Sequence, residues 1–199
     1  MTALRWLALT IVAYAAGASL AVAAMNAVAR PMGPLGAGGP FIFLFGAIVG
    51  VAVGAVQYLG LWRRVALAAW LGASALGAAI GYVLAAVVGE QLGNVISPTG
   101  NIVVGGGTIQ DLSGLVLGLA IGVAQWRVLR GPLGVGRWWI VATAIGVSLG
   151  YGTAAAVLEL LEVDLLKVNL IPSYGAIVGL GAGIAQVIVL WSRRSRVPA

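Results

Sequence analysis

Long stretches of the chain carry no charged side chain, and the charged positions are confined to short segments between them. The uncharged stretches are 6–29, 31–62, 65–89, 91–110, 112–126, 138–158 and 168–192. A helix that spans a bilayer needs about 20 apolar residues, because each residue adds about 1.5 Å across about 30 Å of hydrocarbon. All of these stretches except 91–110 therefore predict spanning helices; the fifth helix is extended by Arg127 and Arg130, whose long side chains can reach the membrane surface.

The stretch 91–110 is the exception, because residues that favour turns interrupt it. Asn94 and Pro98 break the helical pattern. We expect a loop on the extracytoplasmic side, with Val95-Ile96 and Ile102-Val103-Val104 as the two arms of a short hairpin.

The composition agrees with a membrane protein and excludes other classes. Of 199 residues, 61% are hydrophobic and 8% are charged, whereas a soluble domain carries about 25% charged residues. A soluble globular, disordered or collagen-like chain is therefore excluded. Because the chain has no histidine and no cysteine, it lacks the usual catalytic base, the thiol nucleophile and the soft metal ligand. We expect a non-enzyme without cofactor or metal.

The second, fourth and sixth predicted helices share one pattern of small and polar residues. Glycines at every fourth position are followed by a glutamine three residues after the last glycine. The three copies are Gly46, Gly50, Gly54 and Gln57; Gly114, Gly118, Gly122 and Gln125; and Gly175, Gly179, Gly183 and Gln186. Because a helix turns about 100° per residue, each set lies on one helix face.

The first, third and fifth predicted helices repeat as well. The segments 73–82 and 142–151 match position by position, and the match extends to Glu90 and Glu159. Asn26 takes the corresponding place near the end of the first helix. The first helix is therefore interpreted as a copy of a mature element and not as a signal peptide.

The two interleaved repeats predict the architecture. We expect an all-α integral membrane protein with six transmembrane helices, arranged as three helical hairpins, 1–64, 65–130 and 131–199, inserted in the same sense. Repeats of the same sense are related by an axis along the membrane normal, here a pseudo-threefold axis. Residues 1–199 then form a single membrane domain, because one hairpin alone could not bury its glycine face.

The distribution of charges predicts the orientation. With both termini cytoplasmic, that side holds Arg5, Arg63, Arg64, Arg127, Arg130, Arg137, Arg193, Arg194 and Arg196, and no acidic residue. The other side holds Arg30, Lys167, Glu90, Asp111, Glu159, Glu162 and Asp164. This positive-inside pattern predicts a multi-pass protein of a bacterial cytoplasmic (inner) membrane. The net charge of +6 is thereby interpreted as a topology signal and not as a nucleic-acid footprint.

The repeated glycines and glutamines are the first candidate site. Glycine lets helix backbones approach closely, so the nine glycines are candidates for a helix-packing seam, or alternatively for the lining of a narrow pathway. The glutamines lie on the same faces near the cytoplasmic side of the hydrocarbon and are candidates for a polar axis. Their carboxamides need partners there. They either hold helices together, or form a polar constriction that contacts a solute, or face lipid headgroups.

Residues at the outer ends of the odd-numbered helices are the second candidate site. Asn26, Glu90 and Glu159 are candidates for an outer vestibule that attracts cations together with the other acids of that side; the alternative is that they are solvated helix ends.

Aromatic residues gather toward both membrane surfaces. An aromatic belt is expected at the cytoplasmic boundary from Trp6, Trp62, Trp70, Trp126, Trp138, Trp139 and Trp191. Tyr82 and Tyr151 match each other in the outer half, where their hydroxyls need partners.

One segment carries a resemblance. Residues 118–130, Gly-Leu-Ala-Ile-Gly-Val-Ala-Gln-Trp-Arg-Val-Leu-Arg, resemble a motif of uncharacterised bacterial multi-pass membrane proteins, Gly-x-x-x-Gly-x-x-Gln-Trp-Leu-Val-Leu-Arg, which a Trp-Trp-rich helix often follows, as at Trp138-Trp139 here. The resemblance covers the second to sixth helices and departs at Tyr58 and Val187, where the motif has Trp. It implies a membrane protein and no particular activity.

Two functions fit these features. The leading hypothesis is passive or facilitated permeation of a small solute or ion along the Gly/Gln axis. The alternative is a non-catalytic membrane scaffold or assembly subunit that packs through its glycine faces, against a second copy or a membrane-protein partner. A pathway needs hydrated glutamines in at least one state, whereas a scaffold needs them dry and bonded to one another.

Overall fold

The computed structural model describes residues 2–32, 39–96, 107–161 and 170–192. These residues form six α-helices: α1 (Ala3–Met32), α2 (Gly39–Leu61), α3 (Leu67–Ile96), α4 (Gly107–Leu129), α5 (Trp138–Leu160) and α6 (Ile171–Trp191). Each helix contains a span long and apolar enough to cross a membrane. The prediction of an all-helical chain with six such helices is therefore confirmed.

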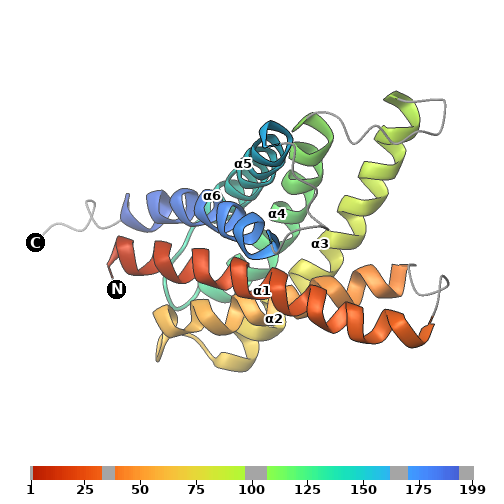
Figure 1. Cartoon of the computed structure of the whole chain (residues 1–199). Coiled ribbons are helices and arrows are strands. Elements are labelled where there is room, and N and C mark those ends of the chain that lie inside the picture. Colours follow the sequence, from red (N-terminus) through yellow and green to blue (C-terminus); the bar gives the residue numbers. More distant parts are fainter. Residues whose placement is uncertain (1, 33–38, 97–106, 162–169, 193–199) are drawn as a thin grey trace, which may run out of the picture.

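The helices form a closed ring in chain order. Each helix packs against the preceding and the following one, and α1 closes the ring by packing against α6; among the described residues, other helix pairs are not in backbone contact. Figure 1 shows α1 and α6 side by side, with the start of α1 and the end of α6 at the same end of the pair. Side chains meet across the centre, where the rings of Trp6 and Trp139 pack edge to face at 6.1 Å.

The core of the ring consists of two clusters of buried side chains. One cluster lies at the end of the ring where α1 begins, and it includes Trp6, Leu61, Trp70, Leu129 and Trp139. The other extends through the middle and the opposite half, where small residues such as Ala13 and Ala78 alternate with valines and tyrosines. Alanine and glycine let the helices approach closely, and the aromatic residues fill the centre.

The outward faces of the helices are apolar. Leu20, Leu149 and Ile188 are among many large aliphatic side chains that point away from the ring and are more than half exposed. An exposed apolar surface of this extent is typical of contact with lipid. The fold therefore suggests a multi-pass membrane protein.

The loop expected over 91–110 is shorter than predicted. Helix α3 continues through Ile96, so Asn94 and Val95-Ile96 are helical and do not form the first arm of a hairpin. The physical reason is that a single asparagine lowers helix propensity by less than about 1 kcal/mol, whereas the stronger break comes only with Pro98. The proposed second arm, residues 102–104, lies outside the described residues.

Candidate functional site

The three repeated glutamines lie in one buried polar layer of the ring. Gln57, Gln125 and Gln186 are at most 1% exposed. Each amide nitrogen donates a hydrogen bond to a hydroxyl on the preceding helix. The pairs are Gln57 Nε2 to Thr10 Oγ1 at 3.3 Å, Gln125 Nε2 to Ser74 Oγ at 3.2 Å, and Gln186 Nε2 to Thr143 Oγ1 at 3.2 Å. Each glutamine thus connects an even-numbered helix to the odd-numbered helix before it.

Indole nitrogens connect the layer to the next helices of the ring. Trp6 Nε1 on α1 donates to Gln186 Oε1 on α6 at 3.1 Å, and Trp70 Nε1 on α3 donates to the Gly54 carbonyl on α2 at 3.0 Å. Hydrogen bonds of the polar layer therefore link α1 to both of its neighbours, α6 and α2, and α3 to both of its neighbours, α2 and α4.

Two of the three glutamines also contact each other. Gln125 Nε2 donates to Gln57 Oε1 at 3.4 Å. Two buried polar atoms of the layer have no partner: the acceptor Gln125 Oε1 and the donor Trp139 Nε1. A buried unpaired group of this kind costs about 1–3 kcal/mol.

The tryptophans do not all form the expected aromatic belt. Trp6, Trp70 and Trp139 are fully buried, so the prediction is wrong for these three residues. Their indole N–H groups lie at the level of the glutamines, where hydrogen bonds satisfy two of them, and this allows tryptophan to enter a core. Trp62 and Trp138 are 60% and 71% exposed, as a belt requires.

The repeated glycines lie where neighbouring helices touch. All nine are buried, and a Cβ added to any of them would come within 3.0 Å of an atom of the adjacent helix. Added to Gly46 it would lie 2.7 Å from the Ala78 carbonyl oxygen, and added to Gly175 it would lie 2.5 Å from the Tyr14 carbonyl oxygen. Since real Cβ atoms do not approach backbone atoms so closely, the contacts of Gly46 and Gly175 need glycine. The faces are covered by helices of the same chain: α3, α5 and α1.

A cluster of tyrosines, which the sequence analysis did not find, occupies the other half of the ring. Tyr82 and Tyr151 share a hydrogen bond of 2.8 Å between their hydroxyls. Tyr174 packs edge to face on Tyr151 at 5.6 Å, and Tyr14 belongs to the same core cluster. The match of Tyr82 to Tyr151 was the one signal of this cluster in the sequence.

The three candidates for an outer vestibule make no contact with one another within the part of the chain that the structure describes. Asn26, Glu90 and Glu159 are exposed near the ends of α1, α3 and α5. The side chains of Asp111, Glu162 and Asp164 lie outside the described ones, so the vestibule stays a prediction. Within the described part of the chain, no group of three potential metal ligands comes together.

Comparison with known proteins identifies no family for the chain. No protein-family model matches it, and no match was found among the curated proteins or the solved structures. The resemblance of residues 118–130 to bacterial multi-pass membrane proteins therefore stays a prediction.

Proposed function

We propose that the chain is a non-catalytic membrane scaffold whose polar layer seals the centre of the ring. One observation supports this proposal most strongly: all three glutamines are buried, and each donates to a hydroxyl of the adjacent helix. A carboxamide that is already bonded inside the protein does not need water, and breaking such bonds in a low-dielectric interior is unfavourable. The glutamines then act as interhelical clamps.

The clamp is proposed to exist in three copies related by a pseudo-threefold axis along the membrane normal. Corresponding glycines meet corresponding residues of the next helix, which supports the proposal. The middle glycines contact the following pairs: Gly50 meets Ser74 and Ala75, Gly118 meets Thr143 and Ala144, and Gly179 meets Thr10 and Ile11. A residue with a hydroxyl group recurs at each junction, and the residue after it is alanine at two junctions and isoleucine at the third. This recurrence is expected for three hairpins that pack in one way.

The scaffold is proposed to lie in a bacterial inner membrane with both termini cytoplasmic. The apolar outward faces support insertion. Arg5, Arg64 and Arg137 are exposed at the end of the ring that carries the tryptophans, and Arg130 lies 5.2 Å from the ring centroid of Trp126. Arginine beside tryptophan is typical of a membrane boundary, and the excess of arginine favours the cytoplasmic side.

Two features of the ring bear on the alternatives. Permeation along the Gly/Gln axis would need the polar layer to open, because the glutamines and three tryptophans fill the centre. The glycine faces are covered by the chain's own helices. A partner or a second copy would therefore bind the outward aliphatic surface, and not the glycines as first expected.

Cysteine accessibility tests the proposal, because the chain has no natural cysteine. The variants Gln57→Cys, Gln125→Cys and Gln186→Cys are made one at a time, with Arg64→Cys as an exposed control near the same end. In liposomes, a membrane-impermeant thiol reagent should modify the control from one side only. It should modify the glutamine positions from neither side until the protein is denatured, because the reactive thiolate needs water.

A solute-flux measurement on the unmodified chain completes the test. Proteoliposomes should exchange small solutes and ions no faster than empty liposomes. Modification of a glutamine position in folded protein, together with flux above the empty control, would contradict the scaffold and favour permeation. Folding of each variant is checked by its thermal unfolding midpoint.

A further inference from the structure

The half of the ring opposite the polar layer contains a central cavity. Its volume is about 270 Å³, and α1, α2, α3, α5 and α6 contribute to its wall. The residues that matter here are Tyr14, Ala18, Phe45, Tyr82, Tyr151 and Tyr174. The proposed scaffold role does not explain this cavity, because the three glutamines lie outside it and only Gly175 of the nine repeated glycines lines it.

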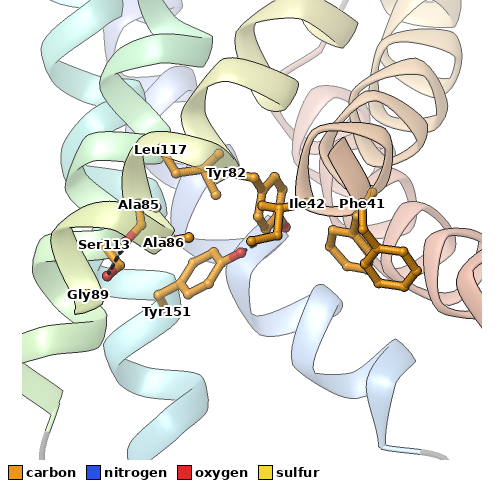
Figure 2. Close-up of a pocket in the computed structure, with 10 residues that line it drawn as sticks. Phe41, Ile42, Tyr82, Ala85, Ala86, Gly89, Ser113, Leu117 and Tyr151 are labelled. Atoms are coloured by element: carbon orange, nitrogen blue, oxygen red, sulfur yellow. Dashed lines mark hydrogen bonds between the residues drawn. The ribbon is translucent and has the colours of Figure 1, made fainter. Parts of the chain in front are cut away.

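A second cavity of about 430 Å³ lies between α2 and α3 and reaches Leu117 on α4 (Figure 2). It shares Phe45, Tyr82 and Tyr151 with the central cavity. It exists because the close approach of α2 and α3 ends at Gly46, which contacts Ala78 and Ala79. Toward the start of α2, bulky Phe41, Ile42 and Phe45 replace glycine and line the space between the two helices.

The tyrosines that line the central cavity offer hydrogen bonds that the protein does not use; two of them, Tyr82 and Tyr151, also line the second cavity. Tyr82 and Tyr151 bond to each other, so one of the two hydroxyls still has a proton to donate. The hydroxyls of Tyr14 and Tyr174 have no hydrogen-bond partner among the described residues. A hydrogen bond from an unpaired hydroxyl in an apolar site to an acceptor on a ligand lowers the free energy of the complex. The cavity thus combines a mostly apolar wall with a few convergent donors, as small-molecule sites do.

We propose that the two cavities form one binding site for a neutral, membrane-soluble amphiphile. Such a molecule has a long apolar chain and a single uncharged oxygen, as in an alcohol or a ketone. The oxygen accepts hydrogen bonds from the tyrosines, and the apolar chain fills the space between α2 and α3. The ligand is neutral because none of the described residues that line either cavity is charged.

The bilayer is the source of this ligand, so the inference rests on the proposed membrane insertion. Phe43 and Leu44 on α2 and Leu84 and Val87 on α3 are exposed beside the α2–α3 cavity. A molecule dissolved in hydrocarbon meets these side chains first and passes between the two helices. The cavity volumes are close to the range of about 300–1,000 Å³ that is usual for small ligands.

Photolabelling of the full-length protein in lipid nanodiscs tests the site. The probe is a long-chain primary alcohol with a diazirine near the end of its chain, and modified peptides are identified by mass spectrometry. We expect saturable labelling of α2 and α3 around Phe41 and Ala86. An unlabelled alcohol should compete, whereas the same chain with a trimethylammonium headgroup should not, because the wall holds no counter-charge.

Two pairs of variants separate the site from general contact with lipid. Ala86→Phe fills the cavity and should reduce saturable labelling at least about tenfold, whereas Ala156→Phe, on the exposed face of α5, should leave it unchanged. Tyr174→Phe removes one donor and should weaken competition about 2- to 10-fold, as expected for one hydrogen bond. Tyr58→Phe, outside both cavities, should have no effect. The tyrosine pair keeps the test valid if Ala86→Phe does not fold.

Other outcomes overturn the inference and are distinct from failure of the scaffold proposal. Labelling that does not saturate, spreads over the outward faces and persists in Ala86→Phe would mean ordinary lipid contact. Equal competition by the charged analogue would overturn the specificity for a neutral oxygen. Thiol modification of the glutamine positions and solute flux test the sealed layer separately. Modified glutamine positions and flux above the empty control, together with saturable labelling, would overturn the scaffold while retaining the ligand site.

Discussion

At the residue scale, the polar layer depends on Gln186, because both polar ends of its side chain are engaged. Its amide nitrogen donates to Thr143, and its oxygen accepts from the indole of Trp6. Replacement Gln186→Leu keeps the approximate volume but leaves the Trp6 N–H buried without an acceptor. We expect the free energy of unfolding to fall by about 1–3 kcal/mol, measured by reversible unfolding in mixed micelles.

A double-mutant cycle assigns that loss to the Trp6–Gln186 contact. Trp6→Phe removes the donor, so Gln186→Leu in that background should have a smaller effect than in the natural chain, with a coupling of about 1 kcal/mol. Trp138→Phe, at a largely exposed indole, serves as the control and should not couple to Gln186. Additive losses would mean that the 3.1 Å contact contributes nothing to stability.

The sequence predicted that the glutamines need partners but not which atoms supply them. Periodicity predicts that Gln57 lies on the glycine face. Which residue of α1 accepts its hydrogen bond depends on the axial position of α1 relative to α2, and in the structure this residue is Thr10. The burial of Trp6 was mispredicted for a related reason. Indole is amphipathic, so hydropathy alone does not distinguish a membrane boundary from a hydrogen-bonded core.

At the scale of the helix, glycine decides how closely neighbours pack. A Cβ at Gly118 would lie 2.7 Å from Ala144 Cα and 2.8 Å from the Thr143 carbonyl oxygen, both backbone atoms that cannot rotate away. We expect Gly118→Ala to lower the free energy of unfolding by about 1–3 kcal/mol, as overpacking does. Gly72→Ala on α3 is the matched control, since an added Cβ there meets no atom within 4 Å.

The comparison between these two glycines excludes a general effect of helix propensity. Alanine favours helix over glycine by about 1 kcal/mol, so Gly72→Ala should be neutral or stabilising. Equal behaviour of the two variants in thermal unfolding would show that the close approach of α4 and α5 is not needed.

The six helices themselves were predictable from the length of the uncharged stretches. The end of α3 at Ile96 was not, because polar residues near a membrane surface do not force a helix to stop.

At the scale of the whole molecule, α1 and α6 close the ring of helices. If the ring consists of three equivalent hairpins, as proposed, any of the three can come first in the chain. Hydropathy predicts the six spans and places α1 beside α2, which follows it in the chain. It does not predict that α6 is the second neighbour of α1. In the closed ring, α1 meets α6 through Gly179 and Thr10 in the way that α5 meets α4 through Gly118 and Thr143. No junction then depends on where the chain begins.

A circular permutant tests this equivalence. The chain is opened between Arg64 and Val65, and a flexible linker joins residue 199 to residue 1, so that residues 65–199 precede residues 1–64. Both new ends lie on the tryptophan side, and every helix keeps its neighbours and its arginine-rich end. We expect it to insert with the natural orientation and to unfold within a few degrees of the natural chain. A permutant opened in the segment between α3 and α4 begins and ends its chain at the opposite ends of these helices and should insert poorly. Loss of folding in the first permutant, judged by thermal unfolding and by labelling of a cysteine at Arg137, would contradict three equivalent hairpins. Folding of both permutants would instead show that the side on which the chain ends lie does not control insertion.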